Sequence, residues 1–85
     1  METNNIKTYV AVEACFTADG ALLPTAVIWE DNTRYEIDRV LDVRPAASLK
    51  AGGAGLRYTV RIGRTETYLF LEETRWFVER RHVPS

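Results

Sequence analysis

The sequence predicts a small all-β domain, in which five or six short antiparallel strands curl into an SH3-like half-open barrel, with an OB-like barrel as the alternative. Apolar residues recur at every second position in several short segments, and no segment shows the three-and-four spacing of an amphipathic helix. A twisted meander of short strands can bury one apolar face only by curling or closing. A chain of 85 residues holds enough material for one such domain.

The composition is that of a folded protein, with 46% hydrophobic and 27% charged residues. We expect a single β domain over residues 7–79, a disordered tail over 1–6 and a frayed tail over 80–85. Charge is distributed unevenly: residues 1–42 hold three basic and eight acidic side chains, a net charge of −5, and residues 43–85 hold eight and four, a net charge of +4. The two halves either attract each other within the fold or leave a basic face for an anionic partner.

The strands are expected in this order. Val10, Val12, Ala14 and Phe16 alternate with less apolar residues, and Asp19-Gly20 supplies a turn. Pro24 opens a second extended stretch over residues 25–30, and a third covers 34–43 with a bulge near Asp38-Arg39. After a long glycine-rich loop over 45–55, three more strands are predicted over 56–62, 68–71 and 76–78.

The registers of the hairpins follow from where their tips fall. A tip at Arg64-Thr65 pairs Val60 with Leu69, and a tip at Glu73-Thr74 pairs Leu71 with Trp76. A three-residue tip, Asp31-Asn32-Thr33, aligns the second and third strands. These registers place one apolar set on a single face, namely Tyr58, Val60, Ile62, Leu69, Leu71, Trp76 and Val78.

Catalytic chemistry finds little support in the sequence, and we expect no enzyme, no metal site and no cofactor. Cys15 and His82 are the only residues of their types, which is too few for a zinc site and a poor basis for a nucleophile and base. The carboxylate pairs Glu72-Glu73 and Glu36/Asp38 are interpreted as solvated surface. The glycines of residues 51–55 precede a strand rather than a helix, so they are interpreted as a connector and not as a phosphate loop.

The opposite face of the last three strands is the candidate site. It carries an aromatic row flanked by arginines, predicted to pair Arg61 with Tyr68 and Arg57 with Glu72. Three exposed aromatics form a patch that monomers usually avoid, so the N-terminal strand, the long loop, a second copy or a partner should cover it. Interfaces are enriched in these residue types, and the predicted partner-binding residues are Arg57, Arg61, Tyr68, Phe70, Arg75 and Phe77.

The spacing of apolar and aromatic residues resembles that of small bacterial domains found at the C-terminus of inactive Y-family polymerase-like proteins of mutagenic DNA repair, or beside them. The resemblance covers residues 24–79 and rests on Pro24, Val27-x-Trp29, Tyr35-x-Ile37, Val40-Leu41, Arg57-Tyr58-x-Val60, Leu69-x-Leu71 and Trp76-Phe77. It implies a non-catalytic adaptor that acts near DNA, and it assigns no functional residue.

The functional prediction is a non-catalytic binding or scaffolding module that engages a protein partner or a second copy through the aromatic and arginine face. The alternative is an accessory domain for single-stranded nucleic acid, because arginines and aromatics interleaved on a sheet also describe a base-stacking surface. The single cysteine, the absence of a long apolar run and the polar N-terminus predict a cytoplasmic protein without a membrane partner.

Overall fold

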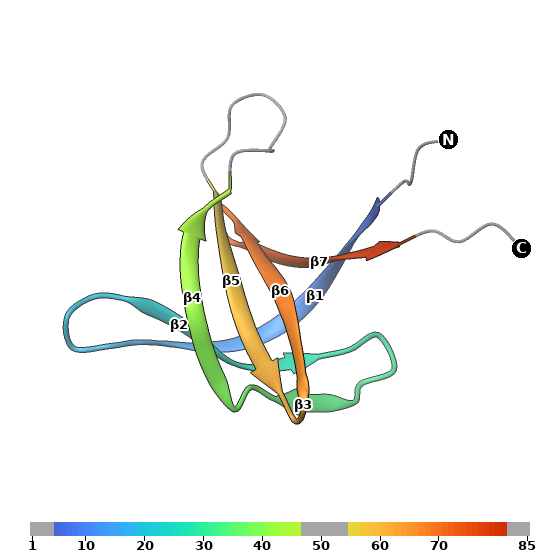
Figure 1. Ribbon diagram of the computed structural model, residues 1–85, viewed down its shortest axis with the longest axis horizontal. Helices are drawn as coiled ribbons and strands as arrows, with labels where there is room; N and C mark the ends of the chain where they lie inside the picture. The colour runs from blue at the N-terminus through green and yellow to red at the C-terminus, as the bar shows by residue number, and fades with distance from the viewer. Residues whose placement is uncertain (1–4, 47–54, 82–85) are drawn as a thin grey trace, which may run out of the picture.

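The computed structural model describes residues 5–46 and 55–81, and these residues form one curled antiparallel sheet of seven strands without a helix (Figure 1). The all-β half-barrel predicted from the sequence is confirmed, with seven strands rather than five or six. The strands are β1 (Asn5–Phe16), β2 (Leu22–Ile28), β3 (Arg34–Glu36), β4 (Arg39–Pro45), β5 (Gly55–Ile62), β6 (Thr65–Glu72) and β7 (Arg75–Arg81). The predicted loop over 45–55 falls largely outside the described residues.

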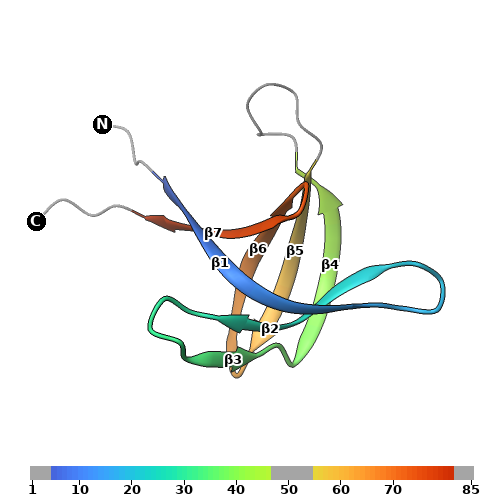
Figure 2. The same cartoon turned by 180° about the vertical axis from the view of Figure 1, so that it is seen from behind.

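The strand order across the sheet is β3-β2-β1-β7-β6-β5-β4, so β1 lies in the interior of the sheet, between β2 and β7, although it comes first in the chain. Residues 5–10 of β1 pair with β7, and residues 11–16 pair with β2. Figures 1 and 2 show the consequence: β1 and β2 form a second layer, which crosses behind β4, β5 and β6 in Figure 1 and in front of them in Figure 2. The apolar faces of the two layers meet between them.

The seventh strand arises because the stretch predicted over 34–43 is broken into two. Ile37 N–H donates to Thr25 O at 2.9 Å, and the next amide, Asp38 N–H, donates to Arg61 O at 2.8 Å. Adjacent residues thus bond to opposite layers of the half-barrel, which makes this point a corner rather than a bulge. The bulge lies later, between Val40 and Asp42, where the register with β5 shifts.

The predicted hairpin registers place each side chain on the correct face of the sheet, but two of them differ from the observed registers by two residues. The β6–β7 register is as predicted, with Leu71 opposite Trp76. In the β5–β6 hairpin Val60 lies opposite Thr67 rather than Leu69, because the tip is Gly63-Arg64, one residue earlier than predicted. Gly63 adopts φ +61°, a left-handed conformation that glycine accepts without strain. An offset of two residues keeps every side chain on its predicted face.

The β2–β3 hairpin shows the same kind of correction. Trp29 N–H donates to Thr33 O at 2.8 Å, which leaves residues 30–32 as the tip instead of the predicted 31–33. Asn32 takes the left-handed conformation, with φ 68°. Asparagine tolerates that conformation far better than the β-branched Thr33, and this preference selects the tip.

The β1 strand departs from strict alternation at its far end. Val10 and Val12 pack against the core, but a register shift between Glu13 and Ala14 interrupts the phase. As a result Phe16, predicted to share the apolar face, is 75% exposed. The turn at Asp19-Gly20 is confirmed, with Gly20 at φ 91° and its N–H bonded to Thr17 O.

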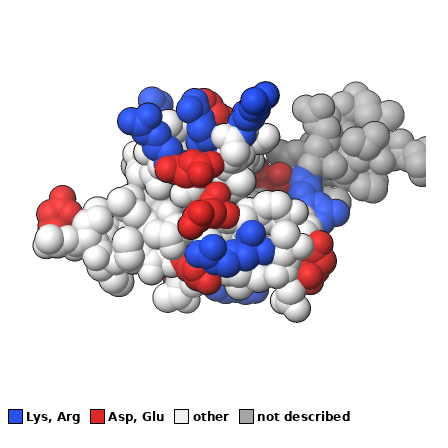
Figure 3. Space-filling view, turned by 90° about the horizontal axis from the view of Figure 1, so that it is seen from below, with Lys and Arg blue, Asp and Glu red and all other residues white. Residues whose placement is uncertain are grey.

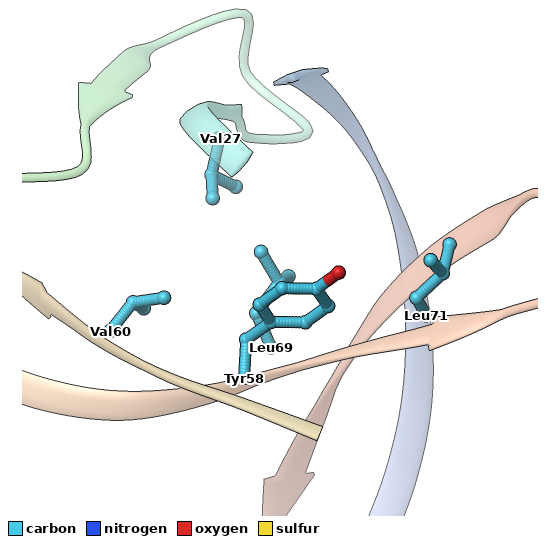
Figure 4. Packing of buried hydrophobic residues seen from close by; sticks show 5 residues of the cluster. All are labelled: Val27, Tyr58, Val60, Leu69 and Leu71. Atoms are coloured by element: carbon cyan, nitrogen blue, oxygen red, sulfur yellow. The ribbon is translucent and has the colours of Figure 1, made fainter. Parts of the chain in front are cut away.

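The core lies between the two layers and is formed by Val27, Tyr58, Val60, Leu69 and Leu71. Figure 4 shows Val27 of β2 directed at Tyr58 and Leu69 on the strands opposite. The Tyr58 hydroxyl donates to Leu22 O at 2.7 Å, so a polar bond ties β5 to β2 across the apolar interior. Burial raises the pKa of that hydroxyl, which keeps it protonated and able to donate.

Candidate functional site

The outward face of the sheet carries a continuous cross-strand row. Tyr9 of β1 lies opposite Phe77 of β7, and Phe77 lies opposite Phe70 of β6. Arg57 of β5 is the next partner, followed by Arg44 of β4. Side chains directly opposite on antiparallel strands share a face and touch. We call the rings of Tyr9, Phe77, Phe70 and the neighbouring Tyr68 the outer aromatic row.

The rings of the row pack directly against one another. Phe70 and Phe77 are stacked, with centroids 5.0 Å apart and planes 6° from parallel. Tyr9 meets Phe77 edge to face at 5.7 Å, and Tyr68 meets Phe70 edge to face at 6.4 Å. Stacked and edge-to-face aromatic pairs each contribute about 0.5–1.5 kcal/mol beyond burial. The row is therefore a packed cluster in its own right.

Burial within the row corrects a sequence-based expectation. Phe77 is 1% exposed and Phe70 8%, whereas both were expected to be exposed; only Tyr68, at 48%, is as predicted. Of the coverings weighed from the sequence, the N-terminal strand contacts Phe77. It places Tyr9 and Lys7 against the Phe77 ring.

Cationic side chains lie over these rings. The guanidinium carbon of Arg75 is 3.5 Å from the centroid of the Tyr9 ring, and that of Arg57 is 4.5 Å from the centroid of Tyr68. Lys7 Nζ lies 4.6 Å from the centroid of Phe77. Such contacts contribute about 0.5–1 kcal/mol each at exposed sites. They also hold the positive charges in fixed positions on this face.

Glu72 is the acidic group within this cluster. Its carboxylate accepts a hydrogen bond from the Tyr9 hydroxyl at 2.9 Å and pairs with Lys7 Nζ at 3.5 Å. The Tyr9 hydrogen bond, helped by the charge of Lys7, lowers the pKa of Glu72 below its ordinary value of 4.5. Glu72 was interpreted from the sequence as solvated surface, and Tyr9 and Lys7 were not predicted to belong to the site. Lys7 and Tyr9 are two residues apart in β1, on the face opposite to that of Val10, and this spacing could have indicated that they lie on the outer face.

The six predicted partner-binding residues have different environments. Arg57 lies opposite Phe70 instead of Glu72, and Arg61 lies opposite Glu66 instead of Tyr68, because of the two-residue offset in the β5–β6 register. Arg61 pairs with Glu66 at 3.0 Å, apart from the row. The structure therefore brings Arg57, Tyr68, Phe70, Arg75 and Phe77 together and leaves Arg61 outside.

Two of the arginines of the row have unused capacity for an acidic partner. Within residues 5–46 and 55–81, no carboxylate forms an ion pair with Arg57 or Arg75. Nε of Arg57 is buried and has no hydrogen-bond acceptor among the described residues. A buried donor without an acceptor is costly, so an acceptor supplied from outside would be favoured at this position.

A concave feature lies among residues of β2, β3, β5, β6 and β7. It is an apolar recess of about 270 Å³ whose walls include Val27, Trp29, Tyr35, Ile62 and Val78. Arg80 lies over Trp29 at 5.6 Å and pairs with Glu30 at 3.4 Å, on one wall. Small-molecule sites usually enclose about 300–1,000 Å³. The recess is thus slightly smaller than the usual small-molecule site.

Other chemistry considered from the sequence gains no support from the structure. Cys15 is exposed on β1, and His82 lies outside the described residues, so their proximity is not defined. The part of the chain that the structure covers has no group of three or more His, Cys, Asp or Glu placed to hold a metal ion. That part also has no helix long and apolar enough to cross a membrane.

Comparison with known proteins finds no matching family model, no matching curated protein and no matching solved structure.

Proposed function

We propose that the chain is a non-catalytic binding module that engages a protein partner through the outer aromatic row. The observation that carries the proposal is the placement of two guanidinium groups over two exposed tyrosine rings, Arg75 on Tyr9 and Arg57 on Tyr68, neither of which forms an ion pair within the described residues. Tyrosine and arginine are the residue types that contribute most at protein interfaces. The partner would present carboxylates to the arginines and an apolar contact to the rings.

The buried phenylalanines support this role through rigidity. Phe70 and Phe77 fix the positions of the two tyrosines, which flank them on either side, so little side-chain entropy remains to be lost on binding. Binding energy would then come from Tyr9, Tyr68 and their arginines, while the phenylalanines serve the stability of the domain. This division differs from the sequence-based expectation that Phe70 itself forms the contact.

The test is affinity capture of the tagged full chain from cells of its source, compared with the variant Arg57→Gln/Arg75→Gln. Glutamine keeps a polar side chain, although a shorter one, and removes the charge. Arg61→Gln is the matched control, because Arg61 lies on the same strand and face as Arg57 but outside the row. A companion protein retained by wild type and by the control, and lost by the double variant, supports the proposal. Equal retention by all three would contradict it.

A second candidate function is binding of single-stranded nucleic acid, favoured by the excess of cations on this face. Lys7, Arg57 and Arg75 share this face, and among them only Lys7 forms an ion pair with a carboxylate of the described residues, that of Glu72. Bases could stack only on the tyrosines, since Phe70 and Phe77 are buried. Fluorescence anisotropy with a labelled oligothymidine at low and high salt tests this function. Binding that weakens steeply with salt would support it, because phosphate contacts release counterions.

We also propose a relation to the domains associated with polymerase-like proteins of DNA repair, which agrees with a protein partner and with a nucleic-acid partner. A cytoplasmic location is proposed as well. An adaptor near DNA could contact a protein, a nucleic acid or both. The capture experiment and the anisotropy measurement distinguish these partners.

A further inference from the structure

The two edges of the sheet differ in how they are protected. β3, at one edge, has only three residues and exposes the charged Arg34 and Glu36. β4, at the other edge, has seven residues and exposes Leu41 and Val43 by 38% and 42%. A short charged edge resists pairing with another chain, whereas a longer edge with apolar side chains promotes it. β4 is the edge open to a further strand.

The backbone of β4 has an outward-facing donor and acceptor at its centre. Ala46 N–H donates to Gly55 O at 3.0 Å, so the backbone of Ala46 points toward β5. Direction alternates along an antiparallel strand, and therefore the N–H and C=O of Val43 point away from the sheet. Pro45 shares that outward direction and has no N–H to leave unpaired, as is typical of proline on an edge strand.

The side chains of β4 divide between the two faces of the sheet. Val43 lies opposite Tyr58, whose side chain is in the core, so Val43 is on the inner face. Asp42 and Arg44 lie opposite Thr59 and Arg57 on the outer face, and they form an ion pair with each other at 2.6 Å. The strand thus has an apolar centre flanked on the other face by one acid and one base.

We propose that a second copy of this chain binds at this edge, with the two β4 strands paired antiparallel about Val43. In this register Val43 meets Val43 of the other copy on the inner face, and each exchanges N–H and C=O bonds with the other. Asp42 of each copy lies opposite Arg44 of the other on the outer face, which gives two pairs of opposite charge. Centring the strands on Asp42 would instead set two carboxylates opposite each other.

The symmetry of this arrangement closes the assembly at two copies. The same edge is used by both, which is the isologous contact of a two-fold dimer, and no free β4 edge remains. The two sheets become one continuous sheet whose outer aromatic rows are on the same side. A partner recognised by one row would therefore meet a second row nearby.

The β1–β2 arm, residues 14–24, adds to the same surface. Figures 1 and 2 both show it extending beyond β4, on the inner side of that strand. It carries no lysine or arginine and one acid, Asp19, and its Phe16 is 75% exposed. In Figure 3 the extension on the left is almost free of charge, whereas basic and acidic side chains lie side by side along the upper border of the molecule. The arm would lie beneath the other copy's β4 and cover its exposed valine.

Charge reversal gives a test that does not depend on knowing any other ligand. Sedimentation equilibrium of the full chain, with reductant present so that Cys15 cannot cross-link, is expected to show a dimer. Asp42→Arg and Arg44→Asp each place like charges opposite each other twice, and we expect each to raise the dissociation constant about thirtyfold. An equimolar mixture of the two variants restores both opposite-charge pairs and should dimerise like wild type.

The control is Arg61→Asp, a charge reversal on the outer face of β5, one strand in from the edge and opposite Arg39 rather than the central residues of β4, which should leave the dimer unchanged. Circular dichroism melting checks that each variant folds, and hydrogen exchange of the Val43 amide gives a measure that needs no substitution: slow in the concentrated wild-type protein and fast on dilution. A wild-type monomer at about 1 mM, or variants that dimerise normally, would overturn the proposal. An equimolar mixture of Asp42→Arg and Arg44→Asp that does not dimerise would also overturn it. Because Arg57→Gln/Arg75→Gln leaves β4 intact, failure of the proposed function and failure of this inference are separable.

Discussion

Replacement of Phe77 by alanine tests whether the outer aromatic row is a second core. Phe77 is 1% exposed and contacts Tyr9, Phe70 and Lys7, and truncation would leave a cavity among them. Removing a buried phenylalanine costs about 3–5 kcal/mol. A domain of this size has a free energy of unfolding of roughly 4–13 kcal/mol. The variant should therefore lose a large part of its stability or unfold.

The assay is urea unfolding followed by the fluorescence of Trp29 and Trp76, with thermal melting alongside. A loss of about 3 kcal/mol lowers the melting temperature of a small domain by about 12 °C or more. Tyr68→Ala is the matched control: it belongs to the same row but is 48% exposed, so we expect a loss of about 1 kcal/mol or less. If the free energy of unfolding of Phe77→Ala is within about 1 kcal/mol of the wild-type value, Phe77 does not stabilise the domain and the packing argument fails.

Two further predictions concern polar groups. Tyr58→Phe removes the hydroxyl that donates to Leu22 O across the core and should cost about 0.5–1.5 kcal/mol in urea unfolding; no change would show that this bond does not join the layers. Glu72→Gln tests the carboxylate that Tyr9 and Lys7 stabilise. Because the pKa of Glu72 is lowered from 4.5 in the folded state, its contribution is complete above pH 4.5 and is lost as the pH falls through the lowered value. The urea midpoint of wild type should exceed that of Glu72→Gln at pH 7, and the difference should shrink in acid; a difference independent of pH would refute the assignment.

Local pattern was sufficient to predict the strands and the faces of the last three. Period-two alternation assigned Tyr58, Val60, Leu69 and Leu71 to one side, and all four are in the core. The β5–β6 tip shifted by one residue without changing this result, because such a shift moves the register by two positions and preserves parity. Turn chemistry decided the remaining offset, where Asn32 and not Thr33 adopts the left-handed conformation.

Tertiary structure decided which strands became neighbours. The pairing of Tyr9 with Phe77 brings the first and last strands together and sets Tyr9 and Lys7 against the Phe77 ring, so Phe77 is buried instead of exposed. The corner at Ile37 and Asp38 likewise left β4 as an open edge. An amphipathic strand carries the same alternation whichever strand it pairs with. Its residues therefore determine which face is apolar, and only the folded sheet determines what lies beside it.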